Sequence, residues 1–205
     1  MSPLETYRDD GVLARWLGRT LGRALPIPPT SLIALGVAAL IAAIAITGDG
    51  APRWVPGALV AVLLATAGAS SGRPHADRLR WAIPSLLRVG EYAAVLWMAA
   101  IAGPRALPAA FALLGVVAFR QYDLVYRLRY RGTVPPPWVT AVTLGWDGRL
   151  VLVWILLVAG ALPAGMYIAA GLLAAVLVGE SVAGWRSFER GQRPMLYEDE
   201  EEEAA

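Results

Sequence analysis

The stretch Thr30–Ile46, TSLIALGVAALIAAIAI, has no charged residue over 17 positions and indicates a helix that spans a membrane. A hydrocarbon core about 30 Å thick needs roughly 17–25 apolar residues in helical form. Comparable stretches recur along the chain: Val55–Ser70, Leu86–Ala102, Ala106–Ala118 with an extension through Tyr126, Val139–Leu162 and Ala164–Trp185. The sequence therefore predicts an all-α integral membrane protein with six transmembrane helices.

The composition also favours a membrane protein. Hydrophobic residues make up 57% of the 205 residues and the mean hydropathy is +0.54, which is more apolar surface than a soluble core of this size could bury. No cysteine is present, which excludes disulfides, thiolate nucleophiles and cysteine metal sites. All 18 basic residues are arginine, a bias typical of GC-rich bacterial genomes, so we expect the bacterial cytoplasmic membrane.

The arginines predict the topology. They lie before the first apolar stretch, between the second and third, between the fourth and fifth, and after the sixth; only Arg53 and Arg105 lie on the other side. Because loops rich in arginine remain in the cytoplasm, both termini are expected to be cytoplasmic. That arrangement requires an even number of spans, which agrees with six.

The segment 1–29 is expected to form an amphipathic juxtamembrane helix. Apolar residues recur on one face and arginines on another: Leu13, Trp16, Leu17, Leu21 and Leu25, against Arg15, Arg19 and Arg23. Such a helix either lies in an anionic headgroup layer or packs on the protein itself, and both alternatives remain open. The six-helix membrane domain is then expected to cover residues 30–190.

The C-terminal segment 191–205 contains six consecutive acidic residues, Glu198–Glu203. A run of like charges without apolar side chains cannot form a packed core, so we expect a disordered acidic tail. The rest of the chain is therefore more basic than its formal net charge of +2. A face of this kind favours contact with anionic membrane lipid over a specific phosphate site.

Three stretches resemble the CDP-alcohol phosphatidyltransferases, membrane enzymes that transfer a phosphoalcohol from a CDP-linked donor to an acceptor alcohol. They are the opening segment with Asp10-Gly11 and Ile27-Pro28-Pro29-Thr30, the stretch Leu87-Arg88-Val89-Gly90-Glu91-Tyr92, and Thr143-Leu144-Gly145-Trp146-Asp147-Gly148-Arg149. The resemblance extends over nearly the whole chain. It implies the six-helix fold of that family, a CDP-linked or other phosphate-bearing ligand, and a homodimer.

The metal-binding aspartates of that family are missing here. Their motif is D-G-x2-A-R-x8-G-x3-D-x3-D, and its aspartates fall on Ala65, Ile83 and Leu87. Divalent metals require hard oxygen ligands, and this region supplies one loop aspartate, Asp77, before Glu91. The chain therefore resembles a degenerate member of the family, for which we expect no catalytic residue, no metal ligand and no cofactor.

Other motifs give little support to further chemistry. Asp10–Arg15 matches D-G-x2-A-R, but the remainder of the motif does not follow it. A relocated metal site on Asp9 and Asp10 remains an alternative. The single histidine, His75, has no second histidine with which to bind metal, and no phosphate-loop, dinucleotide or nucleic-acid-binding pattern is present.

Ionisable residues at membrane depth form the candidate site, because charges there are costly and tend to face a bundle interior. The candidate ligand-binding residues are Arg88, Glu91, Tyr92, Arg120, Asp123, Asp147 and Arg149. Two interpretations remain open. Either these residues form interhelical ion pairs that fix the bundle, or Arg88, Arg120 and Arg149 converge on a phosphate while the acids orient them.

The sequence thus supports two functions of different classes. The first is a non-catalytic membrane protein that acts as a partner subunit of another enzyme or binds a phosphate-bearing lipid or nucleotide. The second is a phospholipid or phosphoalcohol transferase with an altered active site. Small residues on the fourth stretch favour close helix packing and, with the resemblance, a homodimer; they are Ala109, Ala110, Ala112 and Gly115.

Overall fold

The computed structural model describes residues 7–22, 27–71, 73, 78–131 and 136–203. Over these ranges the chain forms helices and turns and no strand. The helices are α2 (Val12–Leu21), α3 (Pro29–Thr47), α4 (Trp54–Leu63), α5 (Ile83–Ala102), α6 (Leu107–Tyr126), α7 (Pro137–Val142), α8 (Gly145–Val158) and α9 (Leu162–Glu203). The predicted all-α class is thereby confirmed.

Five helical segments are long and apolar enough to cross a membrane: Pro29–Gly50, Arg80–Ala102, Pro104–Arg129, Trp138–Val158 and Leu162–Arg186. The remaining predicted span corresponds to a shorter apolar helix, Trp54–Gly68. In that segment α4 passes after Leu63 into a π-helical turn, Leu64–Gly68, and the buried polar residues Ser70 and Ser71 follow. Length and composition therefore indicate a multi-pass membrane protein, with five helices long enough to cross a membrane and one shorter apolar helix.

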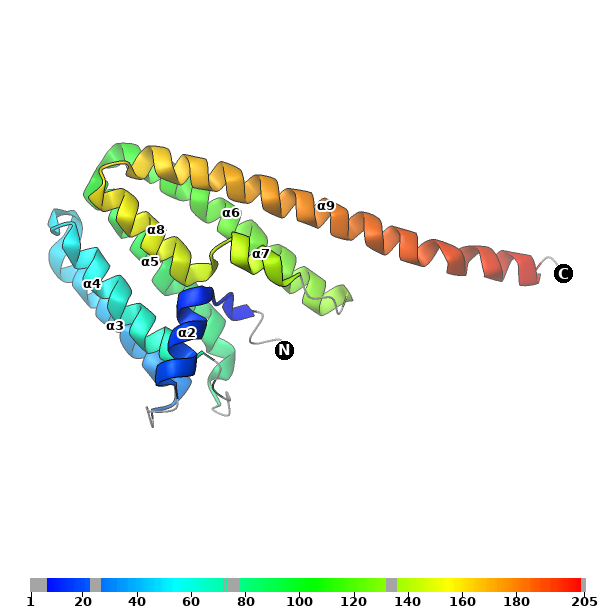
Figure 1. Cartoon of the computed structure of the whole chain (residues 1–205), viewed down its shortest axis with the longest axis horizontal. Coiled ribbons are helices and arrows are strands. Elements are labelled where there is room, and N and C mark those ends of the chain that lie inside the picture. The colour runs from blue at the N-terminus through cyan, green and yellow to red at the C-terminus, as the bar shows by residue number, and fades with distance from the viewer. Residues whose placement is uncertain (1–6, 23–26, 72, 74–77, 132–135, 204–205) are drawn as a thin grey trace.

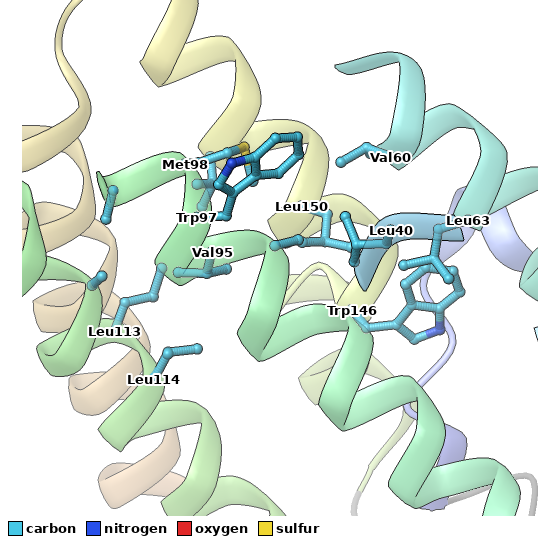
Figure 2. Packing of buried hydrophobic residues seen from close by; sticks show 14 of the residues in the cluster. Leu40, Val60, Leu63, Val95, Trp97, Met98, Leu113, Leu114, Trp146 and Leu150 are labelled. Carbon is cyan, nitrogen blue, oxygen red and sulfur yellow. The ribbon is translucent and has the colours of Figure 1, made fainter. Parts of the chain in front are cut away.

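Helix α5 is the central element of the bundle. It packs against α3, α6 and α8, while α9 runs alongside α6 (Figure 1). The apolar core lies between these helices, and the side chains labelled in Figure 2 are Leu40, Val60, Leu63, Val95, Trp97, Met98, Leu113, Leu114, Trp146 and Leu150. Burial of this core fixes the ends of α5, α6 and α8 next to one another, which is where the charged residues lie.

Helix α2 packs on the bundle through its smallest side chains. Ala14 is fully buried, and a Cβ added at Gly18 would lie 2.1 Å from the carbonyl oxygen of Ser71. The helix thus approaches the turn Leu64–Gly68 and α8 closely. On its outer face Trp16 is 59% exposed. Within the predicted segment 1–29 the structure has a helix at Val12–Leu21 that packs on the protein through its small face, while Arg23 and Leu25 lie outside the described residues. Contact of its exposed apolar face with lipid stays a prediction.

Helix α9 projects beyond the rest of the bundle (Figure 1). Its 42 residues correspond to roughly 63 Å, and only Leu162–Arg186 forms an apolar span. The helix crosses the predicted boundary at residue 190 and continues to Glu203, over the segment for which the sequence predicts disorder. Neighbouring glutamates repel each other on a helix surface, so disorder of the segment 191–205 in solution stays a prediction.

Candidate functional site

Asp9 lies at the centre of a buried group of charges at one end of the bundle. Its Oδ1 accepts hydrogen bonds from Nε and Nη2 of Arg120 at 3.1 and 2.7 Å, and its Oδ2 accepts one from Nη2 of Arg149 at 3.1 Å. Asp9 precedes α2, whereas Arg120 lies in α6 and Arg149 in α8. One carboxylate therefore joins three segments that are far apart in the sequence.

Glu91 of α5 is the second acid of this group. Its Oε1 accepts a hydrogen bond from Nε of Arg149 at 2.6 Å, and its Oε2 accepts one from Nη1 of Arg88. Two further guanidinium nitrogens donate to backbone carbonyls, Nη1 of Arg149 to Thr143 at 3.1 Å and Nη2 of Arg88 to Arg8 at 3.0 Å. The three arginines that the sequence places in one site do lie together, and each already faces an acid.

Residues 8–11, which we call the N-terminal arm, are held by the bundle, and the side chains of Arg8 and Asp10 make four of these hydrogen bonds. Arg8 donates from Nη1 to Ser70 Oγ (3.1 Å) and from Nη2 to the Ala67 carbonyl (3.0 Å). Asp10 accepts from Ser71 Oγ at Oδ2 (2.8 Å) and from Trp146 Nε1 at Oδ1 (2.8 Å). Within the arm, Arg8 Nε donates to Asp10 Oδ2 (2.8 Å). The arm therefore fills the space between the end of α4 and the start of α8.

Asp147 performs a different role from the one expected. Its Oδ1 accepts a hydrogen bond from the backbone N–H of Gly11 at 2.5 Å, and its Oδ2 accepts one from that of Ala14 at 3.0 Å. The first backbone N–H groups of a helix have no partner within the helix, and α2 has no side-chain cap of its own. Asp147 of α8 thus caps α2, and it forms no ion pair with an arginine among the described residues.

Two backbone positions in this region are strained. Asp9 has φ 54° and Leu144 has φ 64°, in the left-handed region that residues other than glycine seldom adopt. The two segments are tied together, because the N–H of Trp146 donates to the carbonyl of Asp9 at 3.2 Å. Gly145 lies at the same contact, where a Cβ would be 2.3 Å from the nitrogen of Gly11. Strain of this kind persists where the surrounding contacts fix the backbone.

Asp123 belongs to a second, separate charge cluster between α6 and α9. Arg127 donates from Nη1 and Nη2 to the two carboxylate oxygens of Glu180 at 2.7 and 2.8 Å, and its Nε lies 2.8 Å from Oδ2 of Asp123. Ser181 donates to Oδ1 of Asp123 at 3.2 Å. Asp123 therefore lies outside the arginine site, and Tyr92 is a partly buried residue packed against the core.

The electrostatics of Asp9 follow from its surroundings. Burial alone would raise the pKa of its carboxyl, but the guanidinium groups of Arg149, Arg120 and Arg88 outweigh that effect and lower the pKa from 3.8 to about 2. Asp9 is thus ionised at neutral pH although it is 3% exposed. The negative charge of Asp9 is stabilised by Arg120 and Arg149, and the positive charges of the three arginines are stabilised by Asp9 and Glu91.

The three positions on which the sequence comparison places the missing aspartates are apolar in this fold. Ile83 and Leu87 are buried in the core, and Ala65 is exposed on α4's π-turn. Among the described residues, no group of three or more His, Cys, Asp or Glu side chains is arranged to hold a metal ion. That search includes Asp9 and Asp10, whereas His75 and Asp77 lie outside the described residues.

The sequence interpretation missed Asp9 as the central residue of the site. Asp9 and Arg120 are separated by 111 positions, and nothing in the local pattern links them. A count of charges gave no signal either, because Glu91, Asp123 and Asp147 already supplied one acid for each of the three arginines.

Comparison with known proteins identifies a family. A family model described as a family of unknown function (DUF5941) matches residues 1–204, so the chain belongs to that family. No curated protein and no solved structure matches the chain.

Proposed function

We propose that this DUF5941 protein is a non-catalytic, multi-pass membrane protein that acts as a partner subunit, on a scaffold similar to that of the CDP-alcohol phosphatidyltransferases. The observation that carries the proposal is the pairing of the three arginines with Asp9 and Glu91. Phosphoryl transfer needs cationic groups or metal ions that face the phosphate. Here the three arginines that could face a phosphate instead form ion pairs with carboxylates of the chain itself, so the network stabilises the fold.

The apolar character of the expected metal positions supports the same proposal. A carboxylate cluster is needed to offset the charge of divalent ions that leave water. Where such a cluster would need carboxylates, Ile83 and Leu87 supply apolar side chains to the core. A transferase with an altered active site is the second candidate, and it is favoured by the strained backbone of Asp9, since strain concentrates at functional sites.

The outer face of α9 is where we place a partner helix. Gly171, Ala175 and Gly179 recur every four residues and are exposed, and a Cβ added at either glycine would meet nothing within 4 Å. Small residues at this spacing allow transmembrane helices to approach closely. Of the predicted face on the fourth span, Ala109 and Ala110 are buried inside the bundle and Gly115 is exposed. We place the homodimer contact on α9, where all three small residues are exposed.

For the topology we propose six helices with both termini in the cytoplasm of a bacterium, supported by the distribution of arginines. The arginine site would then lie at the cytoplasmic end of the bundle. A reporter that is active only in the periplasm, fused in turn to each terminus, should give no signal, and a signal at either end would contradict this orientation.

The function is tested with purified protein in detergent, supplied with CDP-diacylglycerol, an acceptor alcohol and Mg²⁺ or Mn²⁺. We expect no release of CMP above that of heat-denatured protein. Metal-dependent release of CMP that is lost in Asp10→Asn would support the transferase instead. Mass measurement in the same detergent should give a dimer for the wild type and a monomer for Gly179→Ile, with Gly115→Ile as the matched control on α6.

A further inference from the structure

The carboxylate of Asp9 occupies the position that an anionic ligand would take. It receives three hydrogen bonds from Arg120 and Arg149, which project from two different helices, and all three side chains are nearly fully buried. Asp9 itself belongs to neither helix but to the N-terminal arm. An acid from a separate segment thus forms ion pairs with two arginines that come from α6 and α8.

The charges require an anion at this point. Without Asp9, three guanidinium groups would face the single carboxylate of Glu91, an excess of two positive charges in a buried site. In addition, Nε of Arg88 is buried and has no hydrogen-bond partner among the described residues. Arginine forks match the oxygens of a phosphate group as they match a carboxylate, so a phosphate dianion would balance this excess.

The arm has one backbone position that can release the carboxylate. Asp9 is held at φ 54°, a conformation that a residue with a Cβ adopts at a cost in energy. A return of this residue to the extended region would relieve the strain and turn its side chain away from Arg120 and Arg149.

We propose that Arg120 and Arg149 form a phosphate-binding site whose built-in occupant is Asp9, and that a phosphate-bearing ligand enters when the arm withdraws. The ligand class is a phosphate monoester, either free or as the headgroup of a lipid. The contact of Asp9 with the two arginines is then autoinhibitory. It keeps the site closed until a phosphate ligand, which carries more negative charge than the Asp9 carboxylate, replaces it. This inference goes beyond the partner-subunit proposal and can fail independently of it.

The first experiment replaces Asp9 by Asn, which has nearly the same shape, carries no charge and tolerates a left-handed backbone. The variant is placed in phosphatidylcholine nanodiscs and its unfolding midpoint is measured. We expect a lower midpoint than for wild type, and a rise of about 5 °C when inorganic phosphate is added. Phosphate should raise the midpoint of Asp49→Asn much less, because Asp9 still competes for the two arginines there and Asp49 is an exposed acid in the turn after α3.

Two further arms identify the site and the source of the phosphate. The double variant Asp9→Asn/Arg120→Gln should lose the phosphate effect, because one of the two arginines is then absent. Nanodiscs containing phosphatidic acid, without free phosphate, show whether the lipid headgroup alone gives the rise. If neither inorganic phosphate nor phosphatidic acid raises the midpoint of Asp9→Asn, the proposal is overturned.

The second experiment leaves Asp9 in place, so it applies even if Asp9→Asn does not fold. Ser70→Cys introduces a single thiol into a chain without cysteine, at a fully buried position beneath Arg8. We expect a maleimide to label this thiol severalfold faster when phosphate or phosphatidic acid is added. Ser181→Cys, at a buried serine of the second charge cluster, should be labelled at an unchanged rate. Equal labelling of Ser70→Cys with and without either probe would refute the withdrawal of the arm.

Discussion

Gly11→Ala should detach α2 from the bundle, because the added methyl group has no space. An ideal Cβ at Gly11 lies 2.2 Å from the carbonyl oxygen of Leu144 and 2.4 Å from Oδ1 of Asp147. The first is backbone in a strained turn, and the second is the group that caps α2. Neither atom can move without breaking the contact to which it belongs.

The expected cost follows from these two contacts. Overpacking of a tight interior costs about 1–3 kcal/mol, and a hydrogen bond to a charged acceptor contributes about 1.5–3 kcal/mol. Since the methyl group must displace the Asp147 carboxylate from the N-terminus of α2, we expect a loss on the order of 4 kcal/mol. Gly18→Ala should cost a similar amount, because its Cβ would lie 2.1 Å from the carbonyl oxygen of Ser71.

The assay is reversible unfolding in mixed micelles, followed by circular dichroism. Gly115→Ala is the matched control: it also adds one methyl group to a helix, but nothing lies within 4 Å of the new atom. Its free energy of unfolding should stay equal or rise by up to about 1 kcal/mol, as expected for glycine to alanine in a helix.

The double variant Gly11→Ala/Gly18→Ala provides a further test. Helix α2 can be released only once, so the double variant should cost about as much as the larger single effect. Full additivity of the two losses would show that the two glycines act at independent sites. It would refute the conclusion that both serve a single docked helix.

Three further results are expected. Glu180→Gln leaves buried Arg127 with Asp123 as its remaining acid and should cost about 3 kcal/mol in the same unfolding assay; an unchanged stability would mean that the pair is solvated. The pKa of Asp9 is lowered in the folded state, so its contribution of about 2 kcal/mol is complete above pH 4 and is lost as the pH falls toward 2; the difference in stability between wild type and Asp9→Asn should narrow over that range. Phosphate at neutral pH should protect Asp9→Asn from digestion by a protease, and should not protect the wild type.

The parts of the site that could be predicted are those set by position along a single helix. Arg88 and Glu91 are three residues apart, so their contact follows from helix geometry alone. The convergence of Arg120 and Arg149 followed from the cost of charge at membrane depth, which drives both toward the interior. Local periodicity therefore predicted which helix face points into the bundle and which three arginines lie in the site.

The remainder depends on contacts that no local pattern encodes. Asp123 shares a helix face with Arg120, but Arg127 and Glu180 draw it toward α9. Helix α2 has an evident apolar face, yet its glycine and alanine face packs on the protein, because only small residues allow the backbone to approach Ser71. A hydrophobic pattern shows which residues avoid water. How closely the backbone of a helix can approach its neighbour depends instead on how small the side chains at the contact are.

The closed network and the latent anion site are two consequences of the same balance of charge. Four arginines at this end of the bundle form ion pairs with three acids: Arg8 with Asp10, Arg88 and Arg149 with Glu91, and Arg120 and Arg149 with Asp9. With Asp9 in place each of these arginines pairs with an acid of the chain itself, and Arg88, Arg120 and Arg149 exceed Asp9 and Glu91 by one positive charge. The excess rises to two positive charges when Asp9 leaves. A phosphate-bearing ligand must therefore compete with the protein's own acid, and its affinity should increase with every change that weakens the hold on the N-terminal arm, including those at Ser71 and Trp146, which bind Asp10 and not the arginines.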